Sequence, residues 1–299
     1  MTNLVILITG ASSGIGAACA LLLAKQLPGV HLAIAARSQD KLEALAVECR
    51  QAGAKVLVVP GDIGQAEVAE SLAHQVLEHF GQVDVLINNA GYGQMGPLEL
   101  IPAQKAQRQF EVNVLGPLAV IRVVVPAMRD RGGGKIINVS SLAGRVAFPV
   151  GGLYSASKHA LEGLSDSLRR EVSPFNIKVT VIEPGPVTTD FFSAADRIAQ
   201  ETIPEAKNTI YQPAVEAIKN IEQKTALLAW SSQRVAQVIL KAIKARNPRP
   251  RYVAATGGDL MLFMMTKALP TWAVDLFWQK FYNIDLVEKA WKQKNLKTK

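Results

Sequence analysis

The sequence predicts an α/β protein built on a doubly wound parallel sheet of about seven strands, followed by a C-terminal helical region that covers a substrate site. Short runs rich in Val, Ile and Leu alternate with amphipathic stretches of helical period through most of the chain. These runs are apolar at nearly every position, so both faces of the sheet must be covered. A strand, helix, strand rhythm requires right-handed crossovers, which place helices on both faces.

Six strand-like runs precede residue 185 and a seventh follows later. The predicted strands are 4–9, 31–36, 55–60, 83–88, 135–139, 177–183 and 251–255. Before the last strand, a polar helical stretch covers about 190–223 and a helix covers 233–246. No linker-like composition interrupts the chain. We therefore expect one domain over 1–299, with a cofactor and catalytic core over 1–190 and a substrate-binding insertion, last strand and helical tail over 191–299.

Composition excludes a disordered or fibrous protein, because 49% of the 299 residues are hydrophobic. The formal net charge of +8 comes from scattered basic residues, except near the end of the chain. There, a single acid, Glu288, stands among Lys289, Lys292, Lys294, Lys297 and Lys299. We expect a solvated helix face at this end and no nucleic-acid partner, because no basic patch with interleaved aromatic residues occurs elsewhere.

The two cysteines, Cys19 and Cys49, lie in helical patterns without CxxC or Cys/His spacing. They predict buried thiols, with neither a disulfide framework nor a metal site. The apolar run 4–8 is much shorter than a membrane span and lacks a basic leader, so we expect a buried strand and a cytoplasmic protein.

A glycine-rich segment, Thr9 to Gly16, follows the first predicted strand and opens the first predicted helix. Small residues at such a turn let the backbone approach a pyrophosphate at the helix N-terminus. A second strand ends about 20 residues later, as in dinucleotide-binding units, although a glycine-rich turn alone can be a simple tight turn. The residues expected to bind the nucleotide are Gly10, Ser12, Ser13, Gly14, Ile15 and Gly16.

The end of the second predicted strand indicates which nucleotide is bound. NAD-binding proteins usually carry an acid there for the ribose hydroxyls, whereas this chain has Ala36 followed by Arg37. Arg37 can pair with a 2′-phosphate through its planar fork, with Ser12, Ser13 or Ser38 as hydroxyl donors. We therefore expect NADP(H); the alternative is that Arg37 is only a surface cation.

Four motifs together resemble the short-chain dehydrogenase/reductase family, in the family's order and spacing. They are Thr9-Gly10-Ala11-Ser12-Ser13-Gly14-Ile15-Gly16, Asn88-Asn89-Ala90-Gly91, Tyr154-Ser155-Ala156-Ser157-Lys158 and Pro184-Gly185-Pro186-Val187-Thr188-Thr189. The resemblance covers 1–190 densely and implies a Rossmann fold. It also implies further cofactor contacts on the adenine side: Asp62, Ile63, Asn88, Ala90 and Gly91. On the nicotinamide side it implies Pro184, Gly185, Val187 and Thr189, although Pro184 and Gly185 could form only a strand-ending turn.

Tyr154 and Lys158 are spaced i and i+4, which on a helix places both side chains on one face. A phenol with an unperturbed pKa near 10 is a poor acid or base at neutral pH, so it needs a neighbouring ammonium. The pair is therefore a candidate proton-transfer couple, and the resemblance implies that both residues also contact the cofactor.

The resemblance completes a catalytic tetrad with Ser141 and Asn113. Ser141 precedes Tyr154 by thirteen residues and matches the family serine that bonds the substrate oxygen. Asn113 matches the family asparagine at a helix kink, which holds a water in the proton relay with Lys158; taken alone, its position would predict a helix-surface amide. In this mechanism, hydride passes between the nicotinamide and the substrate carbon while Tyr154 moves the proton.

Segments expected to line the substrate pocket are apolar and predict a steroid-, retinoid- or lipid-like carbonyl or alcohol, unless these residues only pack the core. They are Leu142, Val146, Phe148, Val150, Leu153, Phe191 and Phe192. Beyond Gly257, apolar residues recur at helical spacing, but Lys267, Pro270 and Asp275 argue against a membrane span. A lid or dimer contact, an interfacial helix on a membrane surface, and plain core packing all remain open.

The sequence therefore predicts an NADP(H)-dependent carbonyl reductase or alcohol dehydrogenase for hydrophobic substrates, resembling the hydroxysteroid and retinol dehydrogenase branches. The alternatives are a lipid-pathway reductase of the 3-ketosphinganine type at a membrane surface and a non-catalytic NADPH-binding protein. The resemblance also implies a homodimer or homotetramer formed through helices that flank the sheet.

Overall fold

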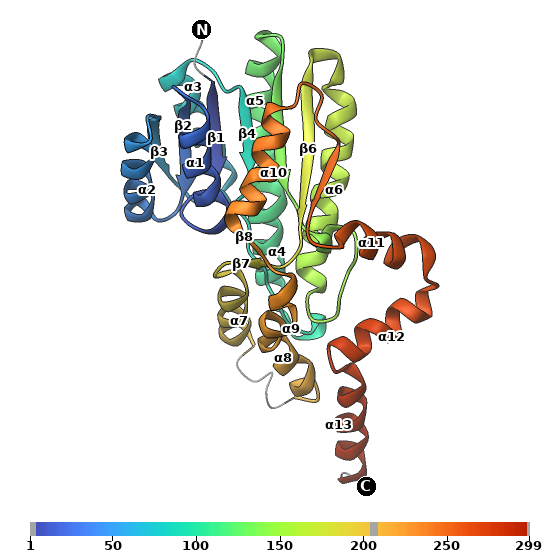
Figure 1. Cartoon of the computed structure of the whole chain (residues 1–299). Coiled ribbons are helices and arrows are strands. Elements are labelled where there is room, and N and C mark those ends of the chain that lie inside the picture. The colour runs from blue at the N-terminus through green and yellow to red at the C-terminus, as the bar shows by residue number, and fades with distance from the viewer. Residues whose placement is uncertain (1–3, 204–208, 298–299) are drawn as a thin grey trace.

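A seven-stranded parallel sheet forms the centre of the computed structural model, which describes residues 4–203 and 209–297 (Figure 1). The order β3-β2-β1-β4-β5-β6-β9 shows that the chain winds outward from β1 in one direction and from β4 in the other. The strands are β1 (Val5–Thr9), β2 (His31–Ala36), β3 (Lys55–Pro60), β4 (Val85–Asn88), β5 (Gly134–Val139), β6 (Ile177–Pro184) and β9 (Arg251–Ala254). The predicted doubly wound sheet is confirmed, and its direction reverses between β1 and β4, where such folds bind nucleotides.

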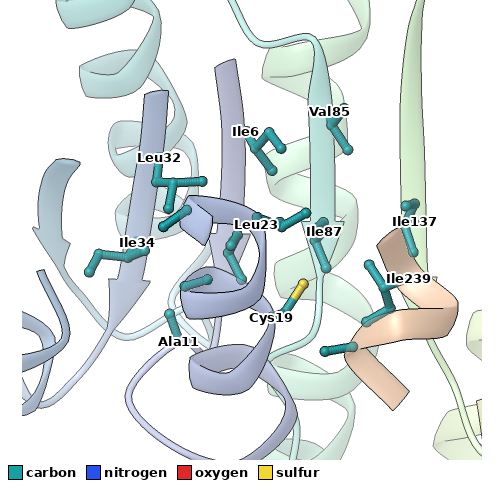
Figure 2. Close-up of a cluster of buried hydrophobic side chains, with 14 of the residues drawn as sticks. Ile6, Ala11, Cys19, Leu23, Leu32, Ile34, Val85, Ile87, Ile137 and Ile239 are labelled. Carbon is teal, nitrogen blue, oxygen red and sulfur yellow. The ribbon is translucent and has the colours of Figure 1, made fainter. Parts of the chain in front are cut away.

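Helices cover both faces of the sheet because successive strand residues point to opposite sides. On one face, Ile6 and Ile8 of β1 pack beneath α1 (Gly14–Gln26), α2 (Gln39–Gln51) and α10 (Ser232–Lys244), as Figure 2 shows for part of this core. On the other face, Val5 and Leu7 pack beneath α3 (Ala66–Phe80), α5 (Gly116–Asp130) and α6 (Gly152–Glu171). Cys19 and Cys49 are free and buried in the first core, as predicted.

Several boundaries differ from the predicted ones by one residue, and two differ by two residues, for local reasons. β4 begins at Val85 instead of Val83, because Asp84 accepts hydrogen bonds from the backbone of Val5 at 2.7 Å and from the side chain of Gln82 at 2.8 Å. This polar turn lies just before the first residue of β4. The predicted helix 233–246 ends at Lys244, where Lys135 donates from Nζ to the carbonyls of Ile243 and Ala245.

Helix α4 (Ala103–Phe110), a π-helical turn at Glu111–Leu115 and α5 form one continuous helix. In the described part of the chain, this 28-residue segment alone is long and apolar enough to cross a membrane by length and composition. Its apolar side faces the core: Val120 and Val124 of α5 pack between the sheet and α3. A helix buried in a protein core can be equally long and apolar, so length and composition alone are weak evidence for a membrane span.

The region after β6 lies at the carboxyl edge of the sheet, below it in Figure 1. The predicted polar helical stretch is present as α7 (Phe191–Thr202), α8 (Gln212–Lys219) and α9 (Ile221–Thr225), while 204–208 lies outside the described residues. A separate two-residue ladder of β7 (Val187–Thr188) and β8 (Trp230–Ser231), which the sequence did not predict, joins the two ends of this region. The chain ends in α11 (Gly258–Phe263), α12 (Thr271–Phe281) and α13 (Ile284–Lys297).

Candidate active site

The glycine-rich loop is held against the end of β4. Gly10 has φ of +67°, and a Cβ there would come within 2.7 Å of the Ala90 backbone, so only glycine fits. Asn89 donates from Nδ2 to the carbonyls of Thr9 and Gly10, both at 3.0 Å. The Thr9 hydroxyl in turn accepts the backbone N–H groups of Asn89 and Ala90, both at 3.1 Å. Sequence reasoning did not include Asn89 among the site residues, and these bonds make it the clamp of the loop.

The same loop offers a cradle for a dinucleotide. Helix α1 begins at Gly14, and its N-cap Ser13 makes no side-chain hydrogen bond to the first turn, so those N–H groups are left without a side-chain cap and can bind an anion. A Cβ on Gly16 would lie 2.2 Å from the Gly10 carbonyl oxygen. A Cβ on Gly14 would lie 3.4 Å from Cγ2 of Thr189, so the loop meets the segment expected to hold the nicotinamide. These features fit a pyrophosphate at the helix N-terminus.

Arg37 lies exposed at the end of β2, next to the half-buried adenine-side residues. Asp62 is not free there, because Arg108 of α4 pairs with it and also with Glu111 at 3.2 Å. Burial raises the pKa of Asp62, but the Arg108 bond, the Gly64 backbone and the charges of Arg108 and Arg37 leave it lowered. Arg108 is thus a further cation beside the expected adenine site.

Tyr154 and Lys158 lie on one face of α6, as their spacing predicts. Both side chains are buried, and the Lys158 ammonium lies 5.9 Å from the centre of the Tyr154 ring. Lys158 donates to the carbonyl of Val139 at 2.9 Å. Burial lowers the pKa of Lys158 to about 8, and the charge of Glu162 opposes that fall.

Burial raises the pKa of Tyr154 to about 12, while a hydrogen bond with the Ser141 side chain lowers it. Ser141 caps the short helix Leu142–Gly144 by accepting the Ala143 N–H at 3.1 Å, and it lies 3.5 Å from the Pro184 carbonyl oxygen. The serine therefore stands between the nicotinamide-side turn and the phenol. A hydroxyl at this position could hydrogen-bond an oxygen atom held beside the phenol.

Asn113 is fully buried in the π-helical turn, not on a helix surface. Its Oδ1 accepts the Tyr92 N–H at 3.1 Å, and its Nδ2 donates to the Tyr92 carbonyl and to Ser157 Oγ, both at 3.0 Å. A Cβ on Gly91 would lie 3.2 Å from Asn113 Oδ1 and 3.4 Å from Lys158 Nζ. The end of β4, the π turn and α6 therefore meet at Lys158.

Three residues expected at the site also pack within the surrounding fold, and their contacts with the cofactor stay predictions. The Asn88 side chain is buried and donates to Asn138 at 2.9 Å, between β4 and β5. Ile63 is buried in the core beneath α5. Gly185 packs against Ala255, where a Cβ would come within 2.7 Å of the Ala255 side chain. At these three positions the observed contacts support the fold around the site.

An aromatic cluster surrounds Tyr154. Phe191 of α7 lies 5.3 Å from the Tyr154 ring, and Val150 packs in the same apolar cluster. From the end of the chain, Tyr282 stacks on Phe148 at 5.5 Å and 9°. Sequence reasoning placed Phe148 and Val150 here but missed Tyr282, because nothing local links residues this far apart along the chain.

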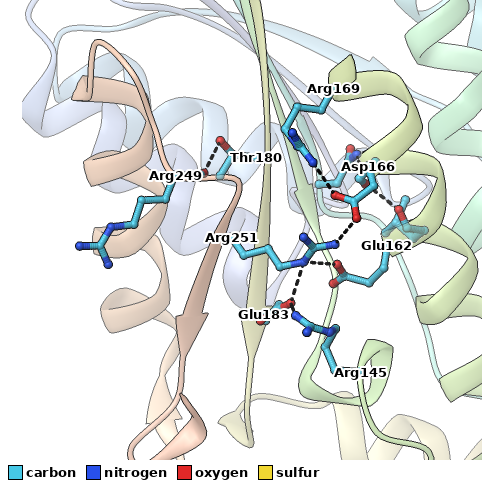
Figure 3. A network of polar contacts seen from close by, with 11 residues as sticks. Arg145, Glu162, Asp166, Arg169, Thr180, Glu183, Arg249 and Arg251 are labelled. Atoms are coloured by element: carbon cyan, nitrogen blue, oxygen red, sulfur yellow. Dashed lines mark hydrogen bonds and ion pairs between the residues drawn. The ribbon is translucent and has the colours of Figure 1, made fainter. Parts of the chain in front are cut away.

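An ion network behind α6 was also missed (Figure 3). Arg251 of β9 contacts Glu162 at 3.0 Å, Asp166 at 2.9 Å and Glu183 at 3.4 Å. Arg145 bonds the buried Glu183 at 3.0 Å. Glu162 lies one helical turn after Lys158, so this network is connected to the face of α6 that carries Tyr154 and Lys158.

Comparisons with known proteins agree with this geometry. A family model described as short chain dehydrogenase matches residues 4–199. The probable short-chain type dehydrogenase/reductase VdlC of Helicobacter pylori is 34% identical over 270 residues, covering 90% of this chain and 95% of the relative. A 3-ketodihydrosphingosine reductase of Bacteroides thetaiotaomicron is 34% identical over 244 residues, covering 82% and 85%. The chain belongs to the short-chain dehydrogenase/reductase family and is an oxidoreductase acting on alcohol or carbonyl groups.

Solved structures support a nicotinamide cofactor. A short chain dehydrogenase/reductase from Burkholderia phymatum in complex with NAD matches with a TM-score of 0.72 and 26% identity, covering 88% of this chain and 92% of its own. A short-chain dehydrogenase from Sphingobium yanoikuyae in complex with NADPH matches with a TM-score of 0.68 and 26% identity, covering 84% and 87%. Because the two complexes hold different cofactors, the preference of this chain depends on its own residues.

Proposed function

We propose that this chain is an NADP(H)-dependent reductase or dehydrogenase for hydrophobic ketones, aldehydes or alcohols of steroid-, retinoid- or lipid-like character. The observation that carries the proposal is the position of Tyr154 inside an apolar aromatic cluster, with Phe191 at 5.3 Å. A polar sugar or acid would leave its hydrogen-bonding groups unpaired against these rings. An apolar substrate loses no hydrogen bonds with water there, and its single carbonyl can bind to Ser141 and Tyr154.

Proton handling follows from the chain's own residues, while the nicotinamide supplies or accepts the hydride. In reduction, the Tyr154 hydroxyl donates its proton to the substrate oxygen, and Ser141 hydrogen-bonds that oxygen as charge develops. The Lys158 ammonium stabilises the resulting phenolate electrostatically. Asn113 fixes the backbone of Tyr92 and the Ser157 hydroxyl beside this lysine, which favours a relay that returns a proton to Tyr154.

The preference for NADP(H) rests on Arg37. Among the described residues Arg37 forms no ion pair; it stands at the end of β2, and the two positions there hold Ala36 and Arg37 without a carboxylate. An Arg37→Asp variant is expected to lose affinity for NADPH and gain it for NADH, whereas Lys25→Ala on α1 is expected to change neither. Equal use of both cofactors by the unmodified protein would contradict this preference.

The test of the function is a substrate panel. Retinoid, steroid, long-chain keto and small aromatic carbonyls are supplied with NADPH or NADH, and nicotinamide absorbance is followed, with Tyr154→Phe as control. We expect turnover of the hydrophobic carbonyls that disappears in the control. NADPH binding without turnover of any compound would favour a non-catalytic NADPH-binding protein.

A lipid reductase of the 3-ketosphinganine type is a second candidate. It is supported by the similarity to the 3-ketodihydrosphingosine reductase and by the exposed apolar residues of α12. Turnover confined to long-chain keto lipids would favour it.

We also propose a homo-oligomer, because Leu115 and Leu118 are exposed on the flanking helix that includes α5. Sedimentation velocity of the Leu115→Ser, Leu118→Ser variant tests this.

A further inference from the structure

Helix α7 lies at the carboxyl edge of the sheet (Figure 1) and forms one wall of the apolar cluster around Tyr154. Phe191, its first residue, lies 5.3 Å from the Tyr154 ring. The buried residues of the helix are Ala195 and Ala199, which pack in the same cluster. Methyl groups interlock little with their neighbours, so these two contacts alone fix the position of α7 only weakly.

One side-chain hydrogen bond joins α7 to a distant part of the chain. The Thr202 hydroxyl, at the last residue of the helix, donates to Gln94 Oε1 at 3.3 Å. Across 4–203 and 209–297, the other hydrogen bonds of α7 stay within the helix or reach the residues just before and after it. Gln94 is fully buried, so its amide oxygen needs a partner of this kind.

Gln94 is itself anchored on α4. Its backbone N–H donates to Oε1 of the fully buried Gln109 at 2.6 Å, and its Nε2 donates to the Met95 carbonyl at 3.1 Å. Gln109 also donates to the Tyr92 carbonyl at 2.8 Å, and Asn113, one helical turn later, donates to the same carbonyl. A chain of hydrogen bonds therefore runs from the π-helical turn to the end of α7. A satisfied buried network of this kind fixes one arrangement of the elements that it joins.

The loop that carries Gln94, between β4 and α4, also packs against both ends of α7. A Cβ on Gly93 would lie 3.0 Å from Cζ of Phe191. A Cβ on Gly96 would lie 2.6 Å from Cδ1 of Ile203, the residue that follows the helix. A shift of α7 against this loop therefore displaces the aromatic ring that lies next to the phenol.

We propose that Gln94 is a positioning residue for the substrate. Through Thr202 it fixes α7, and with it the Phe191 ring, where the ring contacts a hydrophobic substrate bound at Tyr154. The inference rests on the proposed function for the nature of the substrate, but the effect of Gln94 on α7 is measured without turnover. Tyr154 and Ser141 keep their own contacts when the bond to Thr202 is broken, so its loss raises KM and leaves kcat unchanged.

The main test is Thr202→Val, which removes the hydroxyl, keeps the shape of the side chain and leaves the bond between Gln94 and Met95 intact. We expect KM for a hydrophobic carbonyl to rise roughly three- to tenfold, the factor that one hydrogen bond supplies, with kcat and the Kd of NADPH unchanged. Amide hydrogen exchange, followed by mass spectrometry without substrate, should become faster across α7. Gln94→Leu should raise both as well, and the double variant should match Gln94→Leu because both changes remove the same bond.

Two control variants separate this role from a general loss of structure. Thr202→Ser keeps the hydroxyl and is expected to restore both the KM and the exchange rate of the unmodified protein. Ser193→Ala removes an exposed hydroxyl from the same helix, which bonds only the local Asp190 carbonyl at 3.0 Å, and should change neither.

The outcomes distinguish this inference from the proposed function. Faster exchange of α7 in Thr202→Val, without turnover of any hydrophobic carbonyl, would refute the proposed function and support the effect of Gln94 on α7. Unchanged exchange in Thr202→Val would overturn the inference whatever the substrate is. It is also overturned if kcat falls while KM stays the same, or if the double variant exceeds Gln94→Leu.

Discussion

Arg251, the first residue of the last strand, donates from Nε to Oε2 of Glu162 at 3.0 Å. Glu162 is i+4 from Lys158 on α6, and its charge opposes the fall in the Lys158 pKa that burial causes. Burial itself raises the pKa of Glu162, as does the nearby Glu183, while Ser140 and Arg251 lower it. The last strand therefore helps to keep a negative charge behind Lys158.

Replacing Glu162 by Gln is expected to lower the pKa of Lys158, because the opposing negative charge is lost. Activity that needs the Lys158 ammonium would then begin to fall at a pH lower by about half a unit to one unit. The measurement is the pH profile of kcat for carbonyl reduction. Glu171→Gln, at the exposed end of the same helix, is the control and should leave the profile unchanged. A Glu162→Gln profile that overlays the original would contradict this role.

Lys158→Met is expected to abolish activity and to stabilise the protein. Lys158 has a folded pKa of about 8, below its ordinary 10.5, so folding is penalised while the amine is protonated in both states. The penalty corresponds to about 3 kcal/mol, reduced by the lost hydrogen bond to Val139. This free-energy penalty is fully present below pH 8 and disappears as the pH rises toward the pKa of Lys158 in the unfolded chain. Denaturation in urea at several pH values should show the gain in stability shrinking with rising pH; a variant less stable at neutral pH would refute this.

Gly16→Ala and Gly163→Ala form a matched pair. A Cβ on Gly16 would meet the Gly10 carbonyl oxygen at 2.2 Å, whereas Gly163 on α6 has open space around it. The first substitution is expected to weaken NADPH binding severely by displacing the loop. The second should keep binding and add about 0.5 to 1 kcal/mol of stability, because alanine favours the helix. Fluorescence titration with NADPH and thermal melting measure the two effects, and normal binding by Gly16→Ala would be the contrary result.

Asn113→Ala is expected to destabilise the fold by about 1 to 3 kcal/mol as well as to impair catalysis. The substitution leaves the part-buried N–H of Tyr92 without its side-chain partner, while the Tyr92 carbonyl keeps its bond from Gln109 Nε2 at 2.8 Å. Urea denaturation measures the loss, with Gln75→Ala on the exposed side of α3 as control. Unchanged stability would show that the π turn does not rely on this side chain.

Local patterns in the sequence were sufficient for the sheet and for much of the site. The strand runs of β1 to β6 were apolar enough to be recognised within a few residues, and the i to i+4 spacing of Tyr154 and Lys158 placed both on one helix face. The loop of Gly10 to Gly16 was recognised by its glycines and its place after a strand. Each of these features depends on residues close together along the chain, and the local backbone geometry fixes how such residues lie relative to one another.

Relationships between distant segments required the tertiary structure. Asn89 clamps the glycine loop, Tyr282 stacks on Phe148, and Arg251 joins Glu162 to Glu183. Asn113 gave no local sign of burial, because its partners lie on the loop after β4 and on α6. Helices and strands each impose their own spacing on apolar residues, so the sequence by itself determined the secondary-structure elements and the candidate site residues. The packing of those elements decided the charges, the burial and the apolar surroundings in which these side chains act.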